Sequence, residues 1–298
     1  MTHQPTLLVT GASGHLGRRV AEILLARPAG RIVLATRSPA KLADLAARGA
    51  EVRAADFDDP TSLAQAFAGV DRLLLVSTDA LDQPGRRLAQ HYAAITAAVR
   101  AGVRHIVYTS LTHAVAGSAM SLAADHLATE QALAAAPVSW TILRNNLYAD
   151  YVVPKLGHAL ASGRLATASG DGAIAYVTRE DCARAAAAAL ASDDVSRRTL
   201  DITGPAAITG AQLAALASRI TGRTVTFTPV SAETIRAGLT AAGLPAGLVE
   251  ALVTFDLGAA GGELAAVSPA VAELTGRPAT RIEDFLATAL AAASSSPA

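Results

Sequence analysis

Short apolar segments alternate with longer amphipathic ones over the first half of the chain. Each apolar segment is rich in Val, Ile or Leu and is bounded by Gly, Pro, Asp or Asn. Runs that are apolar on both faces are typical of strands buried between two helix layers. The predicted strands are residues 6–10, 31–36, 51–56, 71–77, 104–110 and 139–144. The alternation predicts right-handed βαβ units, and therefore an α/β fold with a doubly wound parallel sheet.

The alternation ends near residue 145, after which helical patterns dominate. Short extended pieces are predicted at residues 174–178, 198–203 and 224–229. We therefore expect a first domain over residues 1–145 and a smaller, mainly helical second lobe over residues 146–298. Strands of this lobe would partly extend the first domain's sheet, so that the two parts are partly interleaved.

Polar residues predict where several helices begin. Ser38 and Asp59 each precede a proline, which places a capping side chain before the first helical position. Thr178 and Thr209 are each followed three residues later by Asp or Gln, the spacing of a capping box. The adjacent pair Asp58 and Asp59 is therefore interpreted as a strand end and a helix cap rather than as a general acid and base.

A glycine-rich turn separates the first predicted strand from the helix that follows. Gly11 allows an unusual φ, Gly14 lets the backbone approach a pyrophosphate, and Gly17 lets the helix pack closely on the sheet. Free N–H groups at the helix N-terminus then bind phosphates. This context predicts a dinucleotide site in a Rossmann-like fold, the alternative being a turn without a ligand. The residues assigned to it are Gly11, Ala12, Ser13, Gly14, His15, Leu16 and Gly17.

Residues at the ends of later strands indicate which dinucleotide is bound. The second strand is followed by Arg37 instead of an acidic residue, which suits the 2′-phosphate of NADPH; the alternative is a solvated loop charge. Asp56 follows the third strand, where it is placed to accept a hydrogen bond from the adenine amino group. Val76, Ser77 and Thr78 end the fourth strand and are expected near the ribose on the nicotinamide side.

Composition and charge exclude several other classes. The 25 basic and 25 acidic residues balance, whereas a nucleic-acid partner favours a basic excess. Apolar runs fall far short of the roughly 20 residues of a membrane span, and the N-terminus lacks a signal-peptide pattern. We expect no metal, because no His, Cys or acidic cluster has ligand spacing. The single cysteine, Cys182, is interpreted as a core thiol, and a cytoplasmic location is expected.

Longer stretches carry a resemblance to a known family. The stretches are VTGASGHLG, HIVYTSLTHA, DHLATEQALAAAPVSWTILRNNLYADY and GDGAIAYVTREDCARAAAAAL. The chain resembles the NmrA-like group of atypical short-chain dehydrogenase/reductases over nearly its whole length. Within that group it looks most like the bacterial NADPH-dependent quinone oxidoreductases of type 2. The resemblance implies an NAD(P)-binding Rossmann domain, a substrate-binding lobe and an NADPH:quinone oxidoreductase with a small-molecule, quinone-like substrate.

The sequence departs from most catalytic short-chain dehydrogenases at their Tyr-x-x-x-Lys pair. Aligned on Glu130, the tyrosine position is Leu122 and the lysine position is His126; the same spacing occurs at Tyr151 and Lys155, outside this aligned position. Alcohol dehydrogenation by that acid–base pair is therefore not expected. Two alternatives stay open. One is direct hydride transfer to a quinone, whose reduction restores aromaticity and needs little acid help. The other is a non-catalytic NADP(H)-binding redox sensor of the NmrA type.

The resemblance also implies catalytic candidates, namely His126, Asn145 and Tyr148. His126 would contact the nicotinamide ribose, the alternative being a helix-packing histidine. Ser110, after the fifth strand, is expected to face the cofactor. Asn145 would hydrogen-bond a quinone oxygen and Tyr148 would stack on the ring, unless both only join the lobes. Apolar helix faces in the second lobe would suit a homodimer.

Overall fold

The chain is divided into two compact units, each assembled from several segments. The structure is a computed structural model that describes residues 4–27 and 30–295 of 298. Unit 1 contains the described residues of Met1–Leu111 together with Asp125–Arg144 and Cys182–Leu200. Unit 2 contains Thr112–Ala124, Asn145–Asp181 and the described residues of Asp201–Ala298. The assignment of one domain to the dinucleotide and of the other to the substrate stays a prediction.

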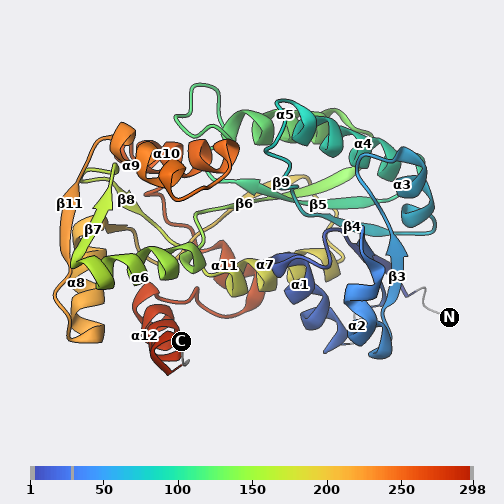
Figure 1. Ribbon diagram of the computed structural model, residues 1–298. Coiled ribbons are helices and arrows are strands. Elements are labelled where there is room, and N and C mark those ends of the chain that lie inside the picture. The colour runs from blue at the N-terminus through green and yellow to red at the C-terminus, as the bar shows by residue number, and fades with distance from the viewer. Residues whose placement is uncertain (1–3, 28–29, 296–298) are drawn as a thin grey trace. The chain divides into compact units, whose positions relative to one another are not determined.

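Unit 1 is built around a seven-stranded sheet with the order β3-β2-β1-β4-β5-β6-β9 (Figure 1). The strands are β1 Thr6–Val9, β2 Arg31–Thr36, β3 Glu51–Ala54, β4 Arg72–Leu75, β5 His105–Leu111, β6 Ser139–Asn145 and β9 Arg198–Ile202. Leu8 in β1 is in parallel register with Val33 on one side and Leu73 on the other. The chain thus runs from β1 to one edge, returns to β4 and proceeds to the other edge. The predicted doubly wound parallel sheet is confirmed.

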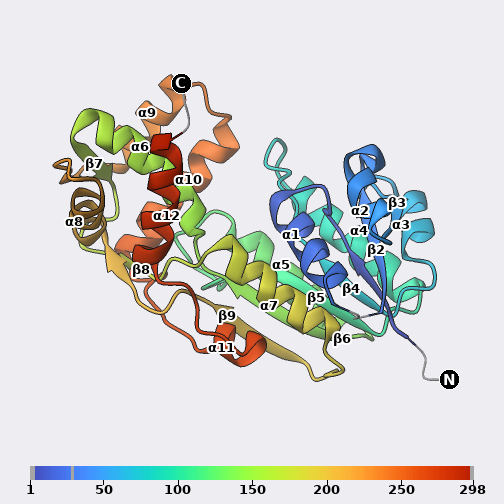
Figure 2. The ribbon, with the colours of Figure 1, turned by 90° about the horizontal axis from the view of Figure 1, so that it is seen from below.

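Helices cover both faces of this sheet. Figures 1 and 2 show α1, α2 and α7 on one face and α3, α4 and α5 on the other. Their bounds, with the 3-10 helix η1, are α1 His15–Leu25, η1 Pro39–Leu42, α2 Ala43–Ala47, α3 Pro60–Phe67, α4 Arg86–Arg100, α5 Ala123–Ala135 and α7 Arg179–Ala191. Leu8, Val33, Leu73 and Ile106 pack with Phe67 in one buried core cluster. The two-sided burial explains why the strands are continuously apolar.

Unit 2 combines short strands with helices. Its elements are η2 Ala149–Tyr151, α6 Val152–Ser162, β7 Arg164–Thr167, β8 Ala173–Ile174, β10 Ile208–Thr209, α8 Gly210–Thr221, β11 Thr226–Pro229, α9 Ala232–Ala241, α10 Ala246–Ala260, α11 Ala270–Thr275 and α12 Ile282–Ser295. β10 pairs with β8, and β11 pairs with β7, so each forms a two-stranded sheet. The predicted mainly helical second part is confirmed.

Three predicted helix caps are present. Asp59 begins α3, and its side chain accepts from the N–H of Thr61 at 2.9 Å. Thr209 forms the complete capping box with Gln212 at the start of α8. Thr178 Oγ1 accepts from the backbone N–H three residues later at 3.0 Å. Local polar spacing therefore fixes these helix starts before any tertiary contact is considered.

Two local predictions are wrong. Ser38 makes no capping hydrogen bond; its own N–H donates to Thr36 Oγ1 at 3.1 Å, and only the short 3-10 helix η1 follows. The stretch 174–178 is not one strand, because only Ala173–Ile174 pairs as a strand and Val177 makes an isolated bridge to Tyr148. In both places nearby side chains or loops, rather than local propensity, provide the backbone partners.

A buried arginine fixes the end of α7 within unit 1. Arg72, the first residue of β4, is 7% exposed. Its Nε donates to the carbonyl oxygen of Leu190 at 2.8 Å, and Nη2 donates to those of Ala189 and Asp194 at 3.2 Å each. The last carbonyls of a helix lack intrahelical partners, and a cation also suits that end of the helix dipole. Arg72 therefore supplies a C-terminal cap from a distant strand.

Replacing Arg72 by Met is expected to lower the free energy of unfolding by about 2–4 kcal/mol, since three carbonyl oxygens lose a charged donor. Urea denaturation followed by circular dichroism measures this loss. The matched control is Arg31→Met, because the Arg31 side chain is 60% exposed and pairs with Glu51 at the surface. We expect the control to cost less than about 1 kcal/mol. Equal losses in the two variants would contradict the role given to Arg72.

Candidate functional site

The turn between β1 and α1 has the backbone geometry that its glycines predicted. Gly11 adopts a φ of +58°, a left-handed conformation that favours glycine. A Cβ added at Gly17 would lie 2.4 Å from the carbonyl oxygen of Gly11, so only glycine fits there without movement of the backbone. The first turn of α1 is thereby held directly against the end of β1.

The same turn leaves backbone donors available. Gly14 is the N-cap of α1 and provides no capping side chain. Within the described residues, no hydrogen bond is found for the backbone N–H groups of Ser13, His15 and Leu16, and Ser13, Gly14 and His15 are exposed. These donors lie at the positive end of the helix dipole. The turn fits a dinucleotide pyrophosphate, which needs backbone N–H groups and close approach.

Two hydrogen bonds join this turn to the end of β2. Ala12 N donates to the carbonyl oxygen of Ala35 at 3.2 Å, and the hydroxyls of Ser13 and Thr36 lie 2.8 Å apart. Arg37 comes directly after Thr36 and is exposed. The structure thus brings the predicted phosphate donors and the predicted 2′-phosphate cation to neighbouring strand ends of one unit.

The charge of Arg37 is less compensated than that of its basic neighbour Arg18. Arg18 on α1 is paired with Glu22 at 3.4 Å and with Asp44, and it donates to the backbone of η1. Across the described ranges, no acidic oxygen lies within 4.0 Å of the Arg37 guanidinium. Arg37 is therefore more available than Arg18 to bind a further anion at this strand end.

The acidic residues after β3 mainly organise the chain. Asp56 is half-buried, and its Oδ1 accepts from the N–H of Asp58 at 3.1 Å. Asp58 Oδ2 accepts from Arg86 at 2.6 Å and from Gln90 at 3.0 Å. Hydrogen bonds from Arg86 and then Gln90 hold the pKa of Asp58 below its usual range. These contacts agree with a structural role for Asp58, while adenine binding by Asp56 stays a prediction.

Residues 76–78, after β4, are held by side chains from three other elements. Each of the three backbone N–H groups donates to a side chain. The pairs are Val76 N to Thr10 Oγ1 at 2.9 Å, Ser77 N to Thr109 Oγ1 at 2.9 Å, and Thr78 N to His91 Nε2 at 3.1 Å. This segment lies at the point where β1 and β4 lead to opposite halves of the sheet, which is where open α/β sheets bind ligands.

His126 lies inside unit 1 with both ring nitrogens engaged. Nε2 lies 2.9 Å from Arg87 Nη2, and Nδ1 lies 2.8 Å from Tyr108 Oη. Arginine only donates, so Nε2 accepts and Nδ1 carries the hydrogen. Burial, and then the charge of Arg87, place the pKa of His126 well below its usual value. A ribose contact would require this network to open, so the proposed role of His126 stays a prediction.

The Ser110 hydroxyl also has its hydrogen-bond partner within unit 1. Its hydroxyl donates to Glu130 Oε1 at 2.6 Å. Arg144 binds the same carboxylate with Nε at 2.9 Å and Nη2 at 2.6 Å. The hydrogen of Ser110 is therefore used, and only its oxygen lone pairs remain for a ligand. Its cofactor contact stays a prediction.

Asn145 and Tyr148 lie together in unit 2. Asn145 Nδ2 donates to Tyr148 Oη at 3.1 Å, and the buried Oδ1 has no partner among the described residues. The oxygen and nitrogen of an amide are assigned from such contacts, and the flipped amide would leave Nδ2 unpartnered instead. Tyr148 stacks on Tyr151, and Arg179 lies 5.5 Å from its ring centroid. One polar atom of the Asn145 amide is thus left for a ligand or water.

Asn146, the next residue, has a structural role. Its Nδ2 donates to the carbonyl oxygen of Leu264 at 3.0 Å, and its Oδ1 accepts from Leu147 N at 2.7 Å. Both ends of the amide are used within unit 2. Of the two adjacent asparagines, Asn145 is therefore the one with unused hydrogen-bonding capacity.

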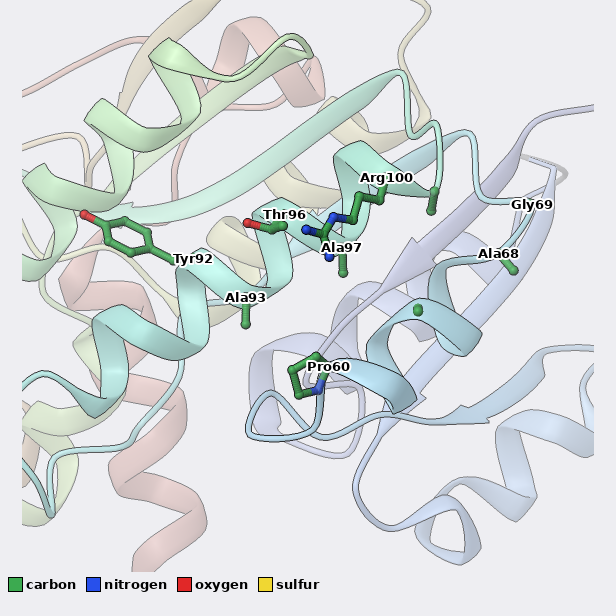
Figure 3. Close-up of a pocket in the computed structure, with 10 residues that line it drawn as sticks. Pro60, Ala68, Gly69, Tyr92, Ala93, Thr96, Ala97 and Arg100 are labelled. Atoms are coloured by element: carbon green, nitrogen blue, oxygen red, sulfur yellow. The ribbon is translucent and has the colours of Figure 1, made fainter.

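A pocket of about 570 Å³ lies between α3 and α4 of unit 1. Figure 3 shows Pro60 at the start of α3 opposite Thr96 and Arg100 on α4. None of the predicted site residues lines this pocket. It is a groove between two surface helices and does not form part of the candidate site.

The NmrA-like family model matches residues 3–277. The chain belongs to the NmrA-like family. It is 39% identical over 279 residues to quinone oxidoreductase 2 of Escherichia coli (strain K12), covering 93% of this chain and 96% of that protein. The crystal structure of an NADPH-dependent quinone oxidoreductase from Escherichia coli, complexed with NADPH, matches with a TM-score of 0.89 and 38% identity, covering 95% and 99% of the two chains. Triphenylmethane reductase of Citrobacter sp., complexed with NADP(H), matches with a TM-score of 0.88 and 34% identity, covering 96% and 99%.

Among the described residues, no helix is both long and apolar enough to cross a bilayer. Residues 4–27 and 30–295 also contain no group of three or more His, Cys, Asp or Glu side chains arranged to hold a metal ion.

Arg87 and His91 of this NmrA-like protein bind the backbone of Thr78 but are not among the site residues predicted from the sequence. A signal was present in the helical spacing. Arg87 and His91 share the buried stripe of α4 with Ala94 and Ile95, where apolar residues are expected. Buried polar residues on an apolar stripe need partners inside the protein, and this requirement marks them for attention.

The buried histidines make the stability of this NmrA-like protein sensitive to acid. Burial lowers the pKa of His91 to about 3 and that of His105 to about 4, and lowers that of His126 well below its usual value. Unfolded histidines titrate near about 6.5, so the unfolded state binds protons first as the pH falls. Stability that is present above about pH 6.5 is therefore lost as the pH falls toward about 4.

Between about pH 8 and about pH 5.5, the free energy of unfolding should fall by about 1 kcal/mol for His91 and by about 1 kcal/mol for His105, and His126 lowers it further. Urea denaturation at the two pH values measures the loss. His91→Gln keeps an acceptor but cannot be protonated, so its loss should be smaller by about 1 kcal/mol. A variant with the same loss as the wild type would show that His91 does not titrate as described.

Proposed function

We propose that the protein is an NADPH-dependent oxidoreductase that reduces quinones and related conjugated acceptors. The observation that carries this proposal is the glycine turn, whose free N–H groups and closely packed glycines fit a pyrophosphate. Support also comes from relatives named as a quinone oxidoreductase, with NADPH bound, and as a triphenylmethane reductase. In this assignment unit 1 binds the dinucleotide and unit 2 supplies contacts to the acceptor.

NADPH is favoured over NADH by Arg37. The 2′-phosphate is the group that distinguishes the two cofactors, and an exposed guanidinium without an acidic partner within 4.0 Å suits it. The residues proposed to hold the remainder are the glycine turn for the pyrophosphate, Asp56 for the adenine and residues 76–78 for the ribose on the nicotinamide side.

Bound NADPH supplies a hydride to the quinone, which with one proton gives a hydroquinone and NADP⁺. The chain's own contribution is binding and orientation. The Asn145 atom without a partner among the described residues is Oδ1, which is an acceptor. In the flipped amide Oδ1 accepts from Tyr148 Oη, and Nδ2 is then free to donate to an oxygen of the quinone. Tyr148 offers an aromatic face. Because Leu122 and His126 replace the tyrosine and lysine of the dehydrogenase pair, the proton is assigned to solvent.

The proposed activity is tested by mixing purified protein with NADPH and a panel of small quinones. The absorbance of the reduced nicotinamide should fall only when both protein and quinone are present. Gly14→Val serves as a negative control, since its side chain occupies the phosphate approach and should abolish turnover. Tight NADPH binding without turnover on any quinone would favour the redox sensor and overturn the enzyme. Location in the cytoplasm and a homodimeric state remain expectations from the sequence.

Arg37→Glu tests the cofactor assignment. Replacing attraction to the 2′-phosphate by repulsion should raise the KM for NADPH at least about ten-fold and change that for NADH by less than about two-fold. Steady-state kinetics with each cofactor and one quinone measures both values. A matched control is Arg31→Met, an exposed arginine at the other end of the same strand. Equal effects of Arg37→Glu on the two cofactors would overturn the role of Arg37.

A further inference from the structure

We propose that Arg87 and His91 are positioning residues for the cofactor, because together they hold the backbone N–H and C=O groups of Thr78 and so fix the edge that receives the ribose. This inference rests on the proposed function and extends it to two residues that do not belong to the glycine turn. Both are buried side chains of α4, four positions apart, and both reach the loop after β4.

The two side chains hold Thr78 from both of its backbone polar groups. Arg87 Nε donates to the carbonyl oxygen of Thr78 at 2.8 Å, and His91 Nε2 accepts from its N–H at 3.1 Å. Residues four apart on a helix lie on one face, so a single rigid element makes both contacts. The direction of this backbone is therefore set by α4 rather than by the loop itself.

The hydrogen positions of His91 follow from its neighbours. The Thr78 N–H must donate, so Nε2 is unprotonated and Nδ1 carries the hydrogen of a neutral ring. Nδ1 lies 3.0 Å from Thr129 Oγ1, whose hydroxyl donates to the carbonyl oxygen of Asp125 at 2.7 Å. Burial also lowers the pKa of His91 to about 3, which keeps Nε2 an acceptor at neutral pH.

Arg87 is fixed in the same way. Its Nη2 donates to His126 Nε2 at 2.9 Å, and His126 Nδ1 donates to Tyr108 Oη at 2.8 Å. Its Nη1 lies 3.7 Å from Asp125 Oδ2. The guanidinium of Arg87 thus links the loop after β4 to α5 and, through His126, to β5. These contacts leave the planar guanidinium little freedom to move.

In this arrangement residues 76–78 have a defined polarity, in that they present hydrogen-bond acceptors rather than donors. All three N–H groups are used by side chains, whereas no hydrogen bond to the carbonyl oxygens of Val76 and Ser77 is found among the described residues. The segment therefore offers acceptors, which suit ribose hydroxyl groups and disfavour phosphate. The glycine turn offers donors, which suit phosphate. Loss of the contacts to Thr78 would leave its N–H without this acceptor and let this polarity change.

The test compares His91→Leu with His91→Gln and with a matched control, His105→Leu. His105 is also a buried histidine of unit 1, but it lies at the first residue of β5 and contacts Thr141 Oγ1 at 3.0 Å. The Kd for NADPH is measured by calorimetry without any quinone, and the Tm is measured for each variant. Steady-state kinetics then gives KM and kcat.

His91→Leu should weaken NADPH binding roughly ten-fold, while His91→Gln, which keeps an acceptor, should stay within about three-fold of the wild type. His105→Leu should lower the Tm but leave the Kd for NADPH unchanged. Arg87→Lys should also weaken NADPH roughly ten-fold, since an ammonium cannot bind Thr78 and His126 with a fixed fork. This variant keeps the inference testable if His91→Leu does not fold.

Two results would overturn different claims. The inference alone would be overturned if the wild-type protein binds NADPH and if His91→Leu and Arg87→Lys bind NADPH as tightly as His105→Leu does. A folded wild-type protein that does not bind NADPH would overturn the proposed function and this inference with it.

Discussion

The hydroxyl group of Thr10 bridges the two strands from which the rest of the site develops. It donates to the carbonyl oxygen of Leu74 at 3.0 Å and accepts from the N–H of Val76 at 2.9 Å. Past this point the chain after β1 turns into the glycine loop, and the chain after β4 leads to the other half of the sheet. Backbone groups that lose their ladder partners there must find others. The Thr10 hydroxyl supplies such a partner for the N–H of Val76.

The same requirement explains the polar residues buried in unit 1. Ser77 and Thr78 continue the segment, and their N–H groups are bound by Thr109 and His91. His91 can accept only because burial keeps its ring neutral. A buried polar group without a partner costs more free energy than a satisfied one contributes, so these partners stabilise the fold. Acid sensitivity is a consequence of that arrangement.

The two units offer different chemistry. Unit 1 holds a turn of free N–H groups and the exposed cation Arg37, both suited to phosphate. Unit 2 holds the incompletely satisfied amide of Asn145 next to the aromatic ring of Tyr148. In its flipped orientation this amide has a free Nδ2 donor, which suits a flat acceptor with a carbonyl oxygen. Leu122 and His126 occupy the aligned positions of the tyrosine–lysine pair of the alcohol dehydrogenases. This combination is consistent with hydride transfer that requires orientation more than acid catalysis.

The sequence by itself determined the doubly wound sheet, the glycine turn and most helix caps. These features depend on local pattern: apolar runs between turns, glycines at fixed spacing and polar side chains three residues from a backbone donor. Even so, local pattern failed at Ser38, whose N–H is taken by Thr36. Only the tertiary structure decided that His126 and Ser110 are committed to internal partners, that Arg72 caps α7, and that Arg87 and His91 hold Thr78. Those contacts join residues distant in sequence, and burial, which selects their protonation states and partners, exists only after the chain has folded.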